Sequence, residues 1–327
     1  MNYSNHALNV LAARTFKGIG DAWINNNITS DSCYEQIIEL IIKKNIDGFS
    51  EVAFNAMKDR LQILIEGLGS SCDGVVAVGD SNFPNLRREL KAGERPSFLF
   101  YKGDLQLLDP NNYNVAVIGL LNPDEDTIED ENKVVEYFVK NEYATIVSGL
   151  AQGCDAVAHK KALDCNGTTV AILPSPLNNI LPAQNRALAQ EIVENNGLLI
   201  TEYLTSTSDY RDLAGRYVKR DRLQALFSDL VVLSASYSKS SFDPNNSKPD
   251  SGARHAMEKA KMYSIERAVI YNSKYDRSIK YDLNRQIISE DKSQANCINP
   301  QDLKCSIKNI IDKTQKKSDL SKQNQLL

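Results

Sequence analysis

Histidine is scarce in this sequence, and its cysteines form no paired motif. The 327 residues include 3 histidines and 6 cysteines, and no two cysteines stand in a CxxC arrangement. Zinc sites need Cys and His ligands at short, regular spacings, and disulfide frameworks are typical of small secreted chains. We therefore expect no metal site, and we interpret the cysteines as free thiols in a reducing compartment.

Long apolar runs and an excess of positive charge are also missing. No apolar stretch approaches the roughly 20 residues of a membrane span, and residues 1–16 have neither the basic region nor the apolar run of a secretion signal. The 38 Lys and Arg against 42 Asp and Glu give a formal net charge of -4, which excludes a protein that coats nucleic acid through a broad positive field. We expect a cytoplasmic protein with no membrane partner.

The fingerprints of common nucleotide-dependent enzymes are absent as well. Residues 119–124 read GLLNPD after a strongly apolar run, with one glycine where the GxGxxG fingerprint has three, and no Walker A sequence occurs. His159 and Asp155 stand four apart, the spacing of an acid–base pair on one helix, but no nucleophile or metal set accompanies them. We favour a structural role for this pair, and we expect no catalytic residues and no cofactor.

Three zones differ in their apolar pattern. Residues 1–90 carry apolar positions at helical spacing and predict a small, mostly helical N-terminal domain. Residues 91–290 alternate short apolar strands with helices, which predicts an α/β core: an extended Rossmann-like fold with a mainly parallel sheet and helices on both faces. Residues 291–327 are polar and predict a tail with no full winged helix.

Small residues gather in the turns that follow the expected strands. Ligands of a parallel sheet bind beyond the carboxyl ends of its strands, where small residues let backbone N–H groups approach an anion at a helix N-terminus. Each turn taken alone is equally compatible with a tight connection that binds nothing. The candidate phosphate-binding residues in these turns are Gly119, Ser148, Gly149, Gly153, Ser251 and Gly252.

Residues 211–222, RDLAGRYVKRDR, form a basic segment in an acidic chain. Helical spacing places Lys219 with Arg222 on one face, and Arg216 with Arg220 on another. Arginines in such a position suit a phosphodiester backbone, which they bind bidentately. The alternative is a solvated helix face with internal ion pairs, and both interpretations stay open at this point.

Taken in order, the motifs resemble those of the DNA-processing protein A family (DprA, also called Smf). The resemblance covers about residues 95–270 and includes SGLAQGCDAVAHKKAL, GLLITEY, YVKRDRLQALFSDLVVLSA and SGARHAMEKA. It implies a homodimer that binds single-stranded DNA and passes it to a RecA-type recombinase, typically in natural transformation, without catalysis. Ser148, Gly149 and Gly153 match the SGxAxGxD turn of the family, and Ser251-Gly252 match its SGA helix start. Lys219, Arg220 and Arg222 match its basic stretch, where Asp221 stands in place of the usual asparagine.

The sequence departs from the family pattern where that pattern is most basic. Leu120 and Leu121 replace the usual Ser-Arg, and Gln152 stands where Arg or Lys is common. Both changes remove cations, which weakens binding to phosphates and flattens its salt dependence. The segment 236–250 is also longer than the family pattern predicts. These departures favour an alternative, a sensor of a nucleotide or nucleotide-derived signal with weak or no DNA binding, whereas the retained basic residues favour DNA. A related nucleoside-processing enzyme is disfavoured, because its PGGxGTxxE motif is absent.

Overall fold

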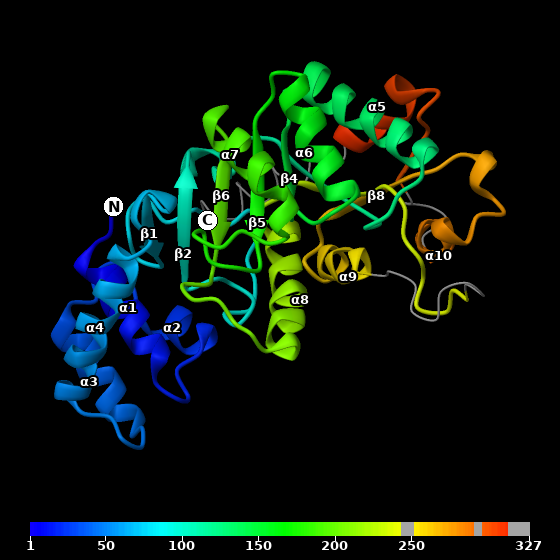
Figure 1. The fold of residues 1–327 in the computed structure, drawn as a ribbon. Helices are drawn as coiled ribbons and strands as arrows, with labels where there is room; N and C mark the ends of the chain where they lie inside the picture. The colour runs from blue at the N-terminus through cyan, green and yellow to red at the C-terminus, as the bar shows by residue number, and fades with distance from the viewer. Residues whose placement is uncertain (243–251, 291–295, 313–327) are drawn as a thin grey trace.

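A computed structural model describes residues 1–242, 252–290 and 296–312 (Figure 1). Within these ranges a nine-stranded sheet has the strand order β1-β2-β6-β5-β4-β3-β7-β8-β9. The pairs from β6 through β9 are parallel, whereas β2 runs antiparallel to both of its neighbours. The predicted Rossmann-like α/β fold with a mainly parallel sheet is confirmed. The strands are β1 (Gly74–Ala77), β2 (Phe98–Gly103), β3 (Asn114–Ile118), β4 (Thr145–Ser148), β5 (Thr169–Leu173), β6 (Leu198–Thr201), β7 (Leu230–Leu233), β8 (Glu266–Ile270) and β9 (Asn296–Ile298).

Helices cover both faces of the parallel sheet, so its central strands are apolar throughout. Every residue of β3, β4, β5, β6 and β7 is buried, as expected of strands without a solvent face. One cluster packs α5 and α6 against β3, β4 and β7, and a second packs α8, α9 and α10 against the opposite face (Figure 1). These helices and α7 are α5 (Glu125–Glu142), α6 (Cys154–Asp164), α7 (Arg186–Glu194), α8 (Tyr210–Leu226), α9 (Ala253–Met262) and α10 (Asp282–Glu290).

The N-terminal segment is helical, as predicted, and packs beside the β1–β2 edge of the sheet (Figure 1). Its apolar side chains share one hydrophobic cluster with residues of β1, β2, β5, β6 and α7. The first strand of the sheet, β1, lies upstream of residue 90, in the range predicted to be helical. The sequence did not reveal this strand, because a run of four residues is too short for its periodicity to distinguish a strand from a helix. The helices are α1 (Asn5–Thr15), α2 (Asp21–Asn27), α3 (Tyr34–Lys44) and α4 (Glu51–Glu66).

Part of the segment predicted as a polar tail belongs to the core. Strand β9 pairs with β8, and residues 303–312 form a helix that buries Ile307, Ile310 and Ile311. Isoleucines at this spacing make an apolar stripe on one helix face, even in a polar sequence. Residues 313–327 and most of the long 236–250 segment lie outside the described residues. No helix in the described ranges has the length and apolar character needed to cross a membrane.

The strand order reverses beside β3, and this reversal positions the candidate site. From β3 the chain proceeds through β4, β5 and β6 on one side, then returns to place β7 on the other side. Loops that leave neighbouring strands in opposite directions open a crevice at the carboxyl edge, where ligands of open α/β sheets bind.

Candidate functional site

A cavity of about 410 Å³ lies at this crevice. Its walls come from the turn after β3, the turn after β4, the first residues of α9 and one face of α8. Three of the sequence-predicted residues meet around it: Gly119, Arg220 and Gly252. Three of the residues that depart from the family pattern, Leu121, Gln152 and Asp221, line the same cavity. Ser251 lies outside the described residues.

Two other predicted glycines sit where the chain closely approaches itself. A Cβ on Gly149 would lie 1.2 Å from Arg220 Nη1, and a Cβ on Gly153 would lie 2.2 Å from the carbonyl oxygen of Leu120. Gly153 also has a φ of 79°, in the region that favours glycine. These positions therefore require glycine to pack the turn against α8 and against the turn after β3.

Ser148 has a structural contact rather than an exposed hydroxyl. Its side chain is buried, and its Oγ donates a hydrogen bond of 2.7 Å to the carbonyl oxygen of Val117. This bond ties the end of β4 to β3, next to the turns that form two walls of the cavity. The hydroxyl thus adds a side-chain bond to the backbone pairing of the two strands whose turns form the walls.

The turn after β4 binds a carboxylate of the chain itself. Asp155 Oδ2 accepts hydrogen bonds from the backbone N–H groups of Gly149 (3.1 Å) and Ala151 (3.3 Å). Arg220 Nη1 lies 3.5 Å from the same oxygen. Burial raises the pKa of the Asp155 carboxyl, and the nearby arginine favours its ionised form. Two donors of the predicted phosphate cradle are therefore already engaged by an internal anion.

His159 lies in the core behind this turn and has a partner there. Its Nδ1 is 2.6 Å from Thr169 Oγ1, and that hydroxyl donates its proton to the carbonyl oxygen of Ile146 at 2.7 Å. The imidazole consequently donates from Nδ1, and burial lowers its pKa to about 3. A neutral imidazole joined to a strand has the contacts of a structural residue, the role that the sequence favours.

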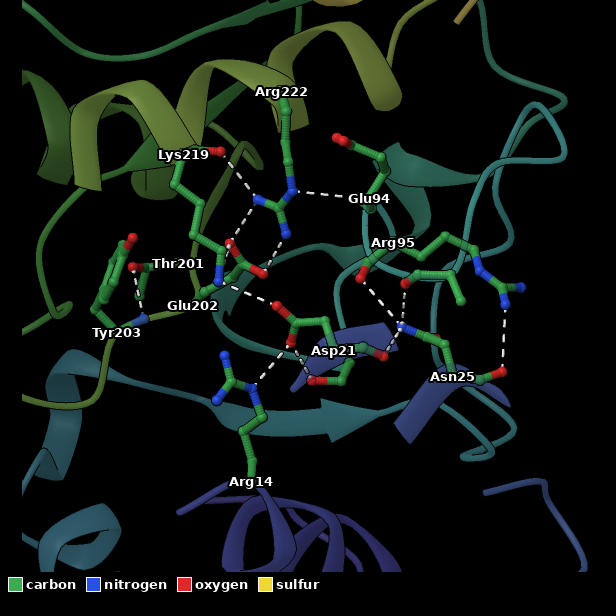
Figure 2. A network of polar contacts seen from close by, with 12 residues as sticks. Arg14, Asp21, Asn25, Glu94, Arg95, Thr201, Glu202, Tyr203, Lys219 and Arg222 are labelled. Atoms are coloured by element: carbon green, nitrogen blue, oxygen red, sulfur yellow. Dashed lines mark hydrogen bonds and ion pairs between the residues drawn. The ribbon is translucent and has the colours of Figure 1, made fainter. Parts of the chain in front are cut away.

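The basic helix is α8, and two of its cations, Lys219 and Arg222, are not among the described residues that line the cavity. Arg222 donates to both carboxylate oxygens of Glu202 at 2.6 and 2.7 Å, and its Nε donates to the carbonyl oxygen of Glu94. Lys219 Nζ lies 3.2 Å from Asp21 Oδ2, on helix α2. Figure 2 shows both side chains reaching into a polar network between α8, the N-terminal helices and the 94–95 segment. They join the parts of the fold together.

The remaining two cations of the predicted set also have internal partners. Arg216 pairs with Asp212 at 2.9 Å and lies over the ring of Tyr203 at 4.3 Å. Arg220 lies 3.6 Å from Asp221 in addition to its contact with Asp155. Among the described residues that line the cavity, Arg220 is the one cation.

Helix α8 supplies cavity residues that the sequence interpretation missed. Tyr217 and Gln224 line the cavity beside Arg220, three residues before it and four after it. Helical spacing from Arg220 would have identified both. Pro182, which also lines the cavity, precedes α7 and gives no signal in the sequence that would place it there.

Comparisons with known proteins show which family and which sequences this chain resembles. A family model described as DNA recombination-mediator protein A matches residues 74–241, just over half of the chain. Protein Smf from Synechocystis sp. is 33% identical over 156 residues, which are 47% of this chain and 37% of that protein. Protein Smf from Borreliella burgdorferi is 30% identical over 159 residues, 49% of this chain and 48% of that protein. The matched region thus spans less than half the length of these curated relatives.

Two solved structures share the fold. That of DNA processing protein A from Streptococcus pneumoniae has a TM-score of 0.67 at 21% identity and covers 93% of this chain and 98% of its own. A DNA processing protein A from Helicobacter pylori, described for its single-stranded DNA binding mode, has a TM-score of 0.57 at 26% identity. That match covers 74% of this chain and 98% of the other.

Proposed function

The chain belongs to the DNA recombination-mediator protein A family, the DprA or Smf proteins, and from this premise we propose that it binds single-stranded DNA in DNA processing. One observation carries the proposal: the family match at 74–241 contains the turns after β3 and β4 and helix α8, which build most of the cavity. The solved relative from Helicobacter pylori, described as binding single-stranded DNA, supports it.

We also propose how the protein uses the strand. It protects single-stranded DNA as a homodimer and loads a RecA-type recombinase, in transformation, recombination or defence. It acts as a binding protein and not as an enzyme, because the groups suited to acid–base chemistry are engaged inside the fold: His159 with Thr169, and Asp155 with the turn. Its six free cysteines, Cys33 among the exposed ones, suit the reducing cytoplasm.

A second candidate function rests on the charge of the cavity. Arg220 is the one cation among its described lining residues, and Asp155 and Asp221 lie within 3.6 Å of it. A groove that grips many phosphates needs more positive charge than this. The observation favours a sensor of a nucleotide or a nucleotide-derived signal, with weak or no DNA binding.

Fluorescence anisotropy with a labelled thymidine oligonucleotide, at low and at physiological salt, tests the first candidate against the second. We expect binding that weakens with salt. Gln152→Lys restores the common cation at an exposed position beside the cavity and is expected to tighten binding. Gln62→Lys adds the same charge on α4 and serves as the matched control. If the folded protein binds no oligonucleotide at low salt, the DNA proposal is wrong and the nucleotide candidate is tested next.

A further inference from the structure

Glu131 is an ionisable side chain enclosed in the core of the protein. It lies on α5 with none of its surface exposed, and neither of its carboxyl oxygens has a hydrogen-bond partner in the described part of the chain. A carboxylate that has no water, no cation and no hydrogen bond is strongly disfavoured in a protein interior. Glu131 is therefore enclosed in its protonated form.

The groups that face Glu131 come from α6 and from the end of β7. Cys154 and Asp155 supply a thiol and a second carboxyl from the first turn of α6, and Ser234 supplies a hydroxyl. Burial raises the pKa of the Glu131 carboxyl from 4.5 to about 8. The thiol and the hydroxyl lower this pKa by a smaller amount, and the charge of the second carboxyl raises it further. The cation nearest to this carboxyl pair, Arg220, lies 3.5 Å from Asp155 and is compensated by it.

The segment 271–281, which also contacts α5, brings no compensating charge to Glu131. Its Lys274 Nζ and Tyr275 hydroxyl both contact Asp130 Oδ2, at 3.0 and 2.5 Å. Asp130 is the residue before Glu131 on α5, and it uses the cation that this segment offers. Among the described groups that act on the Glu131 carboxyl, none is positively charged.

The first turn of α6 connects Glu131 to the crevice. The Cys154 N–H donates to the carbonyl oxygen of Leu120 at 3.0 Å, and a Cβ on Gly119 would lie 2.6 Å from Cys154 Sγ. The turn after β3 is thus packed tightly on this part of α6. Asp155, the next residue, holds the turn after β4 through two backbone N–H groups. The two α6 residues that face Glu131 therefore also position both turns that form walls of the cavity.

Loss of the proton makes this arrangement unfavourable. An ionised Glu131 would stand beside the Asp155 carboxylate in a region without water to screen the two charges. Cys154 contacts both Glu131 and the turn whose Gly119 lines the cavity, so water from the cavity reaches the carboxyl when α6 and that turn separate. We propose that Glu131 is a proton-dependent switch of the crevice: the first turn of α6 stays packed on the turn after β3 while the carboxyl keeps its proton, and the two separate when it ionises.

The direction of the pH dependence follows from the two environments. The pKa of Glu131 is about 8 in the closed form and 4.5 in water, so the closed form binds the proton more tightly. The closed form is therefore fully favoured below about pH 4.5, and opening becomes easier as the pH rises from there to about 8. Within this range the equilibrium constant for opening increases by about tenfold per pH unit, and above it the increase levels off.

Amide hydrogen exchange of the full chain tests the proposal without any ligand, so its outcome does not depend on the proposed function. Exchange is measured at pH 6 and pH 8 for peptides covering residues 117–122 and 149–158, and each rate is corrected for the intrinsic chemical rate. We expect the protection of these peptides to fall by about tenfold or more, and at pH 8 to lie below that of the β5 peptide. Protection that is independent of pH overturns the proposal. Protection equal to that of β5 at both pH values also overturns it, because the crevice then opens only by global unfolding.

Variants on α5 assign the effect to one carboxyl. Glu131→Gln removes the ionisation, and protection of the same peptides should change by less than about twofold between pH 6 and pH 8. Glu131→Leu carries the same expectation and removes the buried polar group altogether, which guards against a glutamine variant that fails to fold. Glu129→Gln, two residues earlier with a side chain that is 65% exposed, is the matched control and should keep the wild-type dependence. A folded Glu131 variant that keeps the full pH dependence shows that another group drives the opening, and the proposal is then wrong.

Discussion

Replacing Arg222 by methionine distinguishes a structural role of the basic helix from a role in DNA binding. The side chains of Arg222 and Glu202 are 5% and 4% exposed and share two hydrogen bonds. Removing one partner of a buried pair costs about 3–5 kcal/mol, because the other charge stays desolvated without its partner. Lys219 Nζ, 3.8 Å from the same carboxylate, offsets part of this loss. We expect Arg222→Met to lower the free energy of unfolding in urea by about 3 kcal/mol.

Two further variants sharpen this result. The double variant Arg222→Met/Glu202→Leu replaces the pair by apolar side chains and should regain most of the lost stability. Arg254→Met breaks a pair with the exposed Glu258 and should cost less than about 1 kcal/mol.

The DNA binding of the double variant tests whether Arg222 contacts a phosphate. Because Arg222 faces the N-terminal helices, the salt dependence of oligonucleotide binding should match that of the wild type. A phosphate contact by Arg222 predicts the reverse: the slope against salt falls by about one unit on its loss. That fall, with Arg222→Met as stable as the wild type, would show that the pair with Glu202 is not the role of this arginine.

Other consequences of the buried contacts are open to measurement in the same way. Gly149→Ala must displace the Arg220 guanidinium from its place beside Asp155, and we expect a loss of about 1–3 kcal/mol in urea denaturation; a loss below about 0.5 kcal/mol would contradict this packing. The pKa of His159 is about 3 in the folded protein and near 6.5 unfolded, so the unfolded state binds more protons and stability falls as the pH drops below about 6.5. In His159→Asn the free energy of unfolding, measured in urea at several pH values, should fall less steeply as the pH drops. An unchanged dependence on pH would contradict the lowered pKa of His159. Burial raises the pKa of Glu131 to about 8 from 4.5, so its contribution to stability is lost as the pH rises from about 4.5 to 8. The free energy of unfolding of Glu131→Gln, measured relative to that of the wild type, should therefore be higher at pH 8 than at pH 5. The same difference between variant and wild type at both pH values would contradict the raised pKa.

The central sheet was predictable because its strands are buried on both faces. In β3 the four residues after Asn114 are apolar without alternation, and the helices between such runs have the length of crossovers, so the parallel core follows from local pattern alone. The outer strands were not predictable. Gly74–Ala77 and Asn296–Ile298 are four and three residues long, and their identity as strands depends on the neighbours with which they pair.

The candidate site was predictable in position but not in its contacts. The small residues of the turns mark the carboxyl edge correctly, yet Gly149 is needed to make room for Arg220, which belongs to a helix that starts some sixty residues later. The basic run of α8 is evident in the sequence, whereas the partner of Lys219 is Asp21, at a separation of 198 residues. Which arginine faces a ligand and which joins two parts of the fold is decided by such distant partners.

The shared core of the N-terminal helices and the sheet also constrains how the protein is made. The cluster that contains Ile24 and Phe54 also contains Leu199 on β6, so this cluster is complete only when the ribosome has passed β6. At about 5–20 residues per second, the segment from α4 to β6 takes on the order of ten seconds to synthesise. For that time the apolar surface that the first helices later bury against the sheet stays exposed on the nascent chain, and it is the surface on which chaperones that meet the chain would act.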